Sequence, residues 1–185
     1  MESAKWRLRS SQTVLDSPYF RVRKDAVELP GGTLIDDYYV REGRGFSAVF
    51  ALTEDRRVVL VRQFKYGIGR EVLELPGGFI DEGEDAEHCA HRELTEETGY
   101  VAPALEYVTK LATEPSNSGF EMHLFLARVA RPEGTQQFDA TESIHVELHD
   151  LEALRALIAG GRIDVAPHVA AIYYVLENCN VRGAS

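Results

Sequence analysis

The stretch that most constrains the fold of this 185-residue chain is GEDAEHCAHRELTEETG, at residues 83–99. Its apolar residues recur at helical spacing, and Gly99 suits the position just after a helix end. Glu93, Glu96 and Glu97 crowd the last turn, where each like-charged pair costs roughly 0.2–0.5 kcal/mol and the helix dipole favours cations. A helix with this ending works against its own stability unless another group binds the carboxylates.

A helical wheel places these glutamates on the side of the helix that faces the protein. The apolar residues that share one side, at about 100° per residue, are Ala86, Cys89, Ala90 and Leu94. Glu93 and Glu97 point into the middle of that side, and Glu96 lies at its edge. Buried carboxylates that repel one another require a cation. Oxygen ligands without an accompanying Cys–His set suit a hard divalent ion such as Mg²⁺ or Mn²⁺.

Strand-like runs and further helices surround this acidic helix. The predicted strands are residues 46–52, 58–61, 72–75, 105–111, 121–129 and 144–148. Two more helices are expected at 151–159 and 166–176. Strands with helices interleaved or appended predict an α/β fold rather than an all-β one.

The N-terminal segment is expected to form a β arm. Two strand-like runs flank Pro30-Gly31-Gly32, which punctuates them as a hairpin turn would. We therefore predict an arm of residues 1–43 followed by a larger domain of residues 44–185. A two-stranded hairpin is only marginally stable alone, so the arm must pack against something.

Charge and cysteine content narrow the function classes. The chain has 30 acidic against 20 basic residues, a net charge of −10, which argues against holding nucleic acid polymers or anionic membranes by the surface field. No run approaches the ~18–20 apolar residues of a membrane span. With Cys89 and Cys179 far apart and no segment resembling a signal peptide, we expect a reduced, cytoplasmic setting.

The acidic helix also carries a family resemblance. The pattern that carries it consists of Gly78, five residues, Glu84, seven residues and then RELTEETGY at 92–100. This pattern resembles the Nudix box, Gly-x5-Glu-x7-Arg-Glu-U-x-Glu-Glu-x-Gly-U, where U is a bulky aliphatic residue. Tyr100, in the last U position, is the single departure. The resemblance implies a Nudix α/β/α sandwich with a mixed β-sheet. It also implies hydrolysis of a nucleoside diphosphate linked to another moiety.

The same resemblance implies a metal-assisted mechanism with Mg²⁺ as cofactor and Mn²⁺ as the alternative. The implied metal ligands are Gly77, Glu93, Glu96, Glu97 and Glu142. Glu142 precedes a strand in the Glu-x-Ile pattern of related enzymes, where it would act as general base or extra ligand. Glu96 and Glu93 are the other catalytic candidates, and Asp139 is a weaker one. A solvated loop acid is the plain alternative for Glu142.

Features outside the box resemble the ADP-ribose and nucleotide-sugar pyrophosphatases. Three features match these enzymes: VRQFK at 61–65, ELPGGFID at 74–81 and a proline sixteen residues beyond Gly99. The implied substrate contacts are Arg62, Lys65, Glu74 and Pro115. Ser116 and Phe120 stand where relatives that prefer ADP-ribose have Gly and Glu, which favours the nucleotide-sugar class over ADP-ribose itself. Taken alone, Arg62 also reads as a surface residue and Pro115 as an ordinary loop proline.

In the nucleotide-sugar pyrophosphatases that this chain resembles, an N-terminal β arm builds a two-fold dimer. A homodimer is also the commonest oligomer in general. We expect the arm to reach a partner's site, with Phe20 or Tyr39 stacking on the base. In a β arm these aromatic residues are more often part of a core or interface.

Alternative functions on the same fold stay open. A non-catalytic sensor of nucleotide sugars would be expected to have lost box glutamates, and all three are present. Isoprenoid diphosphate isomerisation generally needs a cysteine ahead of the box, where this chain has none. Hydrolysis of another dinucleotide remains an alternative to the nucleotide sugar.

Overall fold

The structure is a computed structural model, which describes residues 5–17, 20–137 and 143–181. The chain divides into two compact units. One combines Met1–Gly45 with Ala112–Glu121, and the other combines Phe46–Leu111 with Met122–Ser185. Each unit is described by itself.

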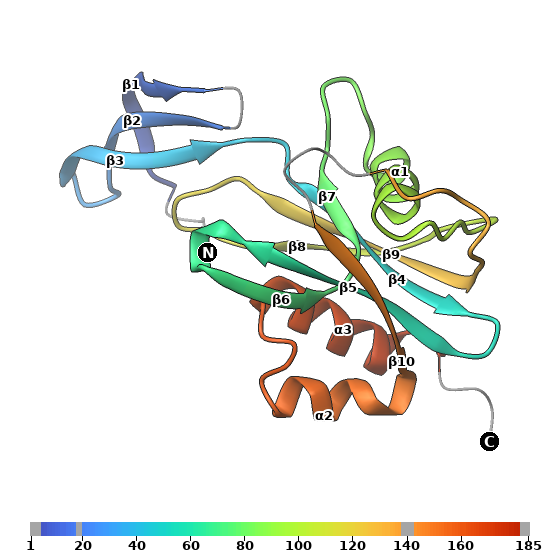
Figure 1. Cartoon of the computed structure of the whole chain (residues 1–185). Helices are drawn as coiled ribbons and strands as arrows, with labels where there is room; N and C mark the ends of the chain where they lie inside the picture. Colours follow the sequence, from blue (N-terminus) through green and yellow to red (C-terminus); the bar gives the residue numbers. More distant parts are fainter. Residues whose placement is uncertain (1–4, 18–19, 138–142, 182–185) are drawn as a thin grey trace. The chain divides into compact units, whose positions relative to one another are not determined.

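The larger unit is built on a seven-stranded mixed sheet in the order β10-β5-β4-β9-β8, with β6 paired to β5 and β7 to β4 (Figure 1). Its strands are β4 (Phe46–Thr53), β5 (Arg57–Lys65), β6 (Arg70–Glu74), β7 (Gly77–Phe79), β8 (Glu106–Ala112), β9 (Glu121–Ala130) and β10 (Ile144–Asp150). β4 runs parallel to β9, whereas β10 runs antiparallel to β5. The central strands are continuous apolar runs because both of their faces are covered.

Helices cover both faces of this sheet (Figure 1). α1 (Ala86–Thr98) lies on one face, and α2 (Leu154–Ala159) and α3 (Ala166–Asn178) lie on the other. Two 3-10 turns, Tyr66–Ile68 and Leu151–Ala153, complete the unit. The predicted α/β/α sandwich is confirmed. Among the described residues, no helix combines the length and apolarity needed to span a membrane.

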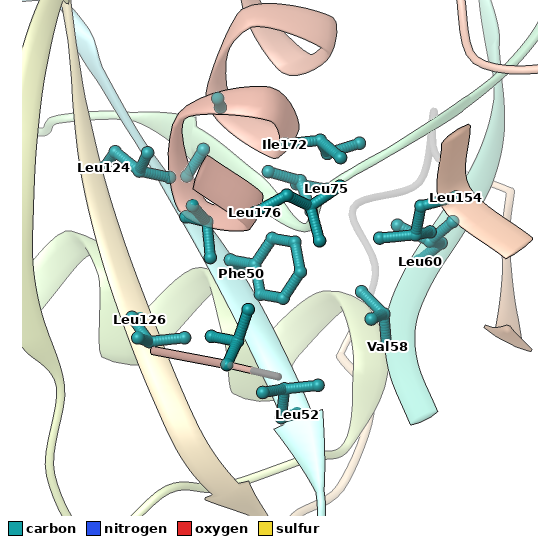
Figure 2. Close-up of a cluster of buried hydrophobic side chains, with 14 of the residues drawn as sticks. Phe50, Leu52, Val58, Leu60, Leu75, Leu124, Leu126, Leu154, Ile172 and Leu176 are labelled. Atoms are coloured by element: carbon teal, nitrogen blue, oxygen red, sulfur yellow. The ribbon is translucent and has the colours of Figure 1, made fainter. Parts of the chain in front are cut away.

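Alternation along the strands separates the core into two layers. Neighbouring strand residues point to opposite faces, so Val49 and Val59 pack on the side of Leu94 in α1. Phe50 and Leu60 pack on the other side, against α3 and α2 (Figure 2). The central strands β4 and β5 are thereby fixed from both faces.

The predicted acidic helix forms, with caps at both ends. The Asp85 carboxylate accepts a hydrogen bond from the His88 N–H at 2.9 Å, and Gly99 ends the helix at φ +69°. Glu97 is buried, as the wheel requires. Glu93 and Glu96 are only partly buried, with side chains 14% and 38% exposed, and both pair with Arg92.

The smaller unit contains a three-stranded antiparallel sheet of β1 (Arg7–Asp16), β2 (Arg21–Glu28) and β3 (Leu34–Glu42). The turn predicted at residues 30–32 joins β2 to β3. The expectation of two strands missed β1. Every residue of β1 is exposed, so this strand lacks the alternation of buried and exposed positions that marks a half-buried strand.

Residues 112–121 pack against the arm, although the sequence placed them with the larger domain. The Arg41 N–H donates to the Asn117 carbonyl at 2.8 Å, and the Arg41 guanidinium lies 3.1 Å from the Glu114 carboxylate. A Cβ on Gly43 would lie 2.0 Å from the ring of Phe120, so glycine is required there. Contacts between segments about 75 residues apart in the chain hold this unit together.

Candidate active site

Two glutamates of α1 converge on the glycine pair of β7. The Gly77 N–H donates to Glu97 Oε2 at 2.8 Å. A Cβ on Gly78 would lie 2.2 Å from Glu93 Oε1, so the Glu93 carboxylate occupies the space that any other residue would fill. Both carboxylates therefore lie directly against the main chain at residues 77–78.

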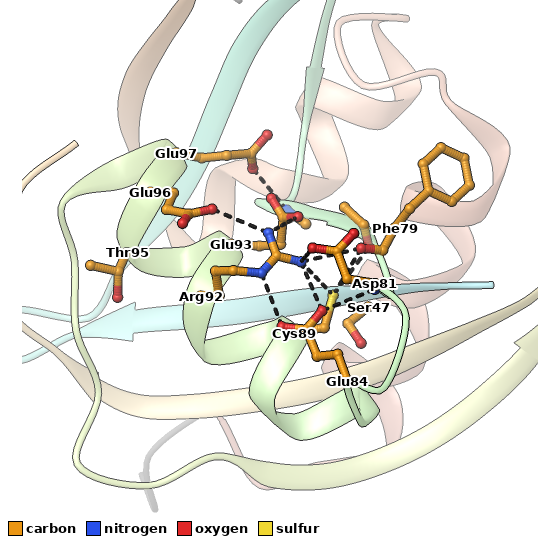
Figure 3. A network of polar contacts seen from close by, with 12 residues as sticks. Ser47, Phe79, Asp81, Glu84, Cys89, Arg92, Glu93, Thr95, Glu96 and Glu97 are labelled. Carbon is orange, nitrogen blue, oxygen red and sulfur yellow. Dashed lines mark hydrogen bonds and ion pairs between the residues drawn. The ribbon is translucent and has the colours of Figure 1, made fainter. Parts of the chain in front are cut away.

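Arg92 pairs with Glu84, which precedes α1, and with Glu93 and Glu96 of the helix (Figure 3). Its Nε lies 2.9 Å from Glu84 Oε1, and its Nη1 lies 2.7 Å from Glu93 Oε1 and 3.1 Å from Glu96 Oε2. Nη2 also donates to the Phe79 carbonyl at 3.2 Å. The bond from Arg92 lowers the pKa of the Glu84 carboxyl. One guanidinium therefore offsets most of the repulsion at this end of the helix.

Glu97 is the carboxylate that Arg92 does not reach. Burial raises the pKa of Glu97 to about 8, and the negative charges of Glu93 and Glu74 act in the same direction. The Gly77 N–H and the Lys65 ammonium oppose this shift without cancelling it. Removing a carboxylate from water disfavours its charged form unless a cation is close by.

The residues present fit a divalent metal ion. Within the described ranges, no three His, Cys, Asp or Glu side chains lie grouped as a ready-made metal site, because Glu93 and Glu96 turn toward Arg92. The donors at the end of α1 are nevertheless all carboxylates, and the space at Gly78 keeps one of them against the main chain. Of the predicted ligands, Glu97 contacts Gly77, and Glu93 and Glu96 pair with Arg92. Glu142 and Asp139 lie outside the described residues.

A buried polar network joins this cluster to the sheet and to α3. Gln63 Nε2 donates to Glu74 Oε1 at 2.9 Å and to Glu97 Oε1 at 3.3 Å. Lys65 Nζ lies 2.8 Å from Glu74 Oε1, and His168 Nε2 lies 3.3 Å from Glu74 Oε2. The predicted residues Lys65 and Glu74 thus belong to this network. Gln63 and His168 were missed, although a glutamine within the apolar run of β5 was a usable signal.

The other predicted substrate residues are Arg62, Pro115, Phe20 and Tyr39. Arg62 points to the opposite face of β5 from Gln63, and its Nε donates to Glu147 Oε1 at 2.5 Å. Pro115, Phe20 and Tyr39 belong to the smaller unit. Phe20 and Tyr39 are exposed.

The smaller unit has a pocket of its own, of about 460 Å³, between β3 and residues 115–119. Pro115 and Tyr38 line it together with the guanidinium-bearing residues Arg23 and Arg41. The Tyr38 hydroxyl donates to the Ser116 carbonyl and fixes the loop to the strand. Phe120 is buried beneath the Arg41 guanidinium, which lies 5.0 Å from the ring centre.

Comparisons with known proteins agree with this geometry. Residues 41–170 match a family model described as NUDIX domain, and residues 6–40 match one described as nucleoside diphosphate sugar hydrolase N-terminal domain. An ADP-ribose pyrophosphatase of Bacillus subtilis is 30% identical, with 95% of each chain covered. A methanol dehydrogenase activator of Bacillus methanolicus is 31% identical over 89% of each chain. A crystal structure titled ADP compounds hydrolase matches with a TM-score of 0.82 at 24% identity, covering 96% of each chain.

Replacing Gly78 by alanine tests the placement of Glu93. The added methyl group collides with Glu93 Oε1, so Gly78→Ala is expected to displace this carboxylate and weaken Mn²⁺ binding by about 10- to 100-fold. Titration of Mn²⁺ followed by electron paramagnetic resonance measures this directly. Gly67→Ala is the matched control, because a Cβ at Gly67 meets no atom within 4 Å. Wild-type affinity in Gly78→Ala would contradict the prediction.

Proposed function

The chain belongs to the Nudix family, and from this membership we propose that it hydrolyses the diphosphate bond of nucleoside diphosphate sugars with a divalent metal ion. The products are a nucleoside monophosphate and a sugar phosphate. The observation that carries the proposal is the set of glutamates at the end of α1, held against Gly77 and Gly78. All three box glutamates are present, which favours the hydrolase over a non-catalytic sensor.

Glu93, Glu96 and Glu97, with the main chain of Gly77, are the residues that would hold the metal ion, and we propose Mg²⁺. When bound there, a divalent ion neutralises diphosphate charge and lowers the pKa of a bound water. The chain's own contribution is orientation. Gly77 and Gln63 fix the Glu97 carboxylate through two hydrogen bonds.

Arg92 and Lys65 supply the positive charge of the chain at this site. Arg92 holds Glu84 and Glu93 in place through its fork of donors. The Lys65 side chain is 42% exposed while its ammonium pairs with Glu74, so it can also meet a phosphate oxygen from solvent. Glu74, Glu84, Glu93, Glu96 and Glu97 outnumber these two cations, so the charge that attracts an anionic substrate would come from the bound metal ion.

The substrate class follows from the relatives and from the smaller unit. The Bacillus subtilis relative is named for ADP-ribose, and the N-terminal family model for nucleoside diphosphate sugars. Phe120 is packed under Arg41, so this position offers no carboxylate to a terminal ribose. We propose a nucleotide sugar such as GDP-mannose alongside ADP-ribose, with Pro115 and the nearby pocket contributing to recognition.

Removing one metal-binding charge tests the hydrolase. Glu97→Gln keeps the size and the hydrogen bond from Gly77 but removes a charged ligand, so turnover should fall by orders of magnitude while the fold survives. Release of nucleoside monophosphate from ADP-ribose, GDP-mannose and UDP-glucose at saturating Mg²⁺ is the measurement. Near-normal turnover of Glu97→Gln would show that this carboxylate does not serve a metal ion.

The identity of the general base is tested by comparing two glutamate-to-glutamine variants. Glu142→Gln is expected to lower kcat by about 10²- to 10⁴-fold with little change in KM, as loss of a general base does. Glu96, the most exposed of the three box glutamates, is the second candidate for accepting the proton. A rate loss confined to Glu96→Gln would move the role from Glu142 to Glu96.

We also propose that the arm forms a homodimer and reaches the partner's substrate with Phe20 or Tyr39. The large apolar side chains exposed on the arm are Trp6, Leu8, Val14, Leu15, Phe20, Leu34 and Tyr39. A monomeric protein rarely exposes so many on one small sheet, whereas a two-fold interface would bury them.

Charged substitutions on the arm test the dimer. The double variant Leu8→Glu, Leu34→Glu places charges at two of these exposed positions, and light scattering should report a monomer with a raised KM. Ala104→Glu, an exposed loop position of the larger unit, is the matched control and should stay dimeric. A monomeric wild-type chain, or a double variant that remains dimeric, would refute the interface.

A further inference from the structure

Two buried carboxylates of the larger unit share a single amide group. Gln63 Nε2 lies 2.9 Å from Glu74 Oε1 and 3.3 Å from Glu97 Oε1, and all three side chains are buried. Carboxylates repel one another in a poorly solvated interior, so the group between them must donate to both.

The chemistry of the amide fixes its orientation. A glutamine NH₂ group has two hydrogens, and here each one has a carboxylate acceptor. Rotating the amide by half a turn would place its oxygen against both carboxylates, which is repulsive. Gln63 is therefore held in one orientation, and it holds Glu97 in turn.

Glu74 is held from two further directions. Lys65 Nζ lies 2.8 Å from Oε1, and His168 Nε2 lies 3.3 Å from Oε2. The network thus runs from His168 on α3 through Glu74 on β6 and Gln63 on β5 to Glu97 on α1. Helices on opposite faces of the sheet are joined by one line of polar contacts.

His168 leaves one of its buried polar atoms, Nδ1, without a hydrogen bond among the described residues. Burial lowers the pKa of His168, which favours the neutral ring. A neutral ring that donates from Nε2 to Glu74 carries only a lone pair on Nδ1. An apolar residue would avoid this unsatisfied atom, so the bond to Glu74 accounts for a histidine here.

We propose that Gln63 and His168 are positioning residues that hold Glu97 in the orientation that binds the metal ion. This inference rests on the proposed function of the glutamates. Gln63 fixes Oε1 and the Gly77 N–H fixes Oε2. Each oxygen accepts one bond and retains a second lone pair for a cation. His168 acts through Glu74, which fixes Gln63 from the other side.

The test measures Mn²⁺ binding to the full chain by electron paramagnetic resonance, without substrate. Gln63→Met keeps the length of the side chain and removes both donors, so the Kd for Mn²⁺ should rise by about 10- to 100-fold. His168→Leu should raise it less, because two side chains separate it from Glu97. The double variant should bind as Gln63→Met alone does, because both residues act through one chain of contacts.

Two controls separate positioning from general destabilisation. Val59→Ala removes buried apolar volume from the same strand, and should lower Tm without changing Mn²⁺ affinity. His168→Gln restores a donor, and should recover the affinity lost in His168→Leu.

Unchanged Mn²⁺ affinity in Gln63→Met, additive losses in the double variant, or an equal loss in Val59→Ala would overturn the positioning role. A wild-type chain that binds no Mn²⁺ would instead overturn the proposed metal-dependent function, and this inference with it.

Discussion

The site depends on the burial of one carboxylate, that of Glu97, against the Gly77 N–H. This contact requires α1 to end where β7 passes, and the cap at Gly99 ends the helix there. The glycines of β7 permit two other close approaches, because a Cβ on Gly77 would lie 2.2 Å from the Ser47 carbonyl oxygen and one on Gly78 would lie 2.2 Å from Glu93 Oε1. The sandwich supplies the rest, because β4 and β5 are anchored from both faces and cannot shift away from the helix.

Charge compensation explains how the helix tolerates its own ending. Arg92 spreads one guanidinium over Glu84, Glu93 and Glu96, which removes most of the repulsion seen in the sequence. Glu97 is left to a different set of partners: a main-chain N–H and the amide of Gln63. The acids of the Nudix box therefore have two kinds of partner: Glu84, Glu93 and Glu96 are bound to Arg92, and Glu97 is bound to a main-chain N–H and an amide.

Local patterns in the sequence were sufficient for the acidic helix, its end at Gly99, six of the seven strands of the sheet and the residues at the end of α1. They were insufficient for contacts made across the fold. Gln63 and His168 are more than a hundred residues apart, and neither has a neighbour in sequence that reveals their shared carboxylate. β1 was not predicted because no residue of it is buried. The attachment of residues 112–121 to the arm depends on the fit of Phe120 to Gly43, which no periodicity encodes.

The packing of residues 112–121 against the arm determines when, during synthesis, the smaller unit can be completed. The strands β1, β2 and β3 are made first and can pair as soon as residue 42 is available. Their unit is complete only when Ala112–Glu121 follows, after most of the larger sheet has been made. Because domains generally fold as units while the chain is produced, the surface of the nascent arm around Gly43 stays uncovered until residues 112–121 have been made. The larger unit still lacks β9, β10, α2 and α3 at that moment, so its chain is completed after that of the smaller unit.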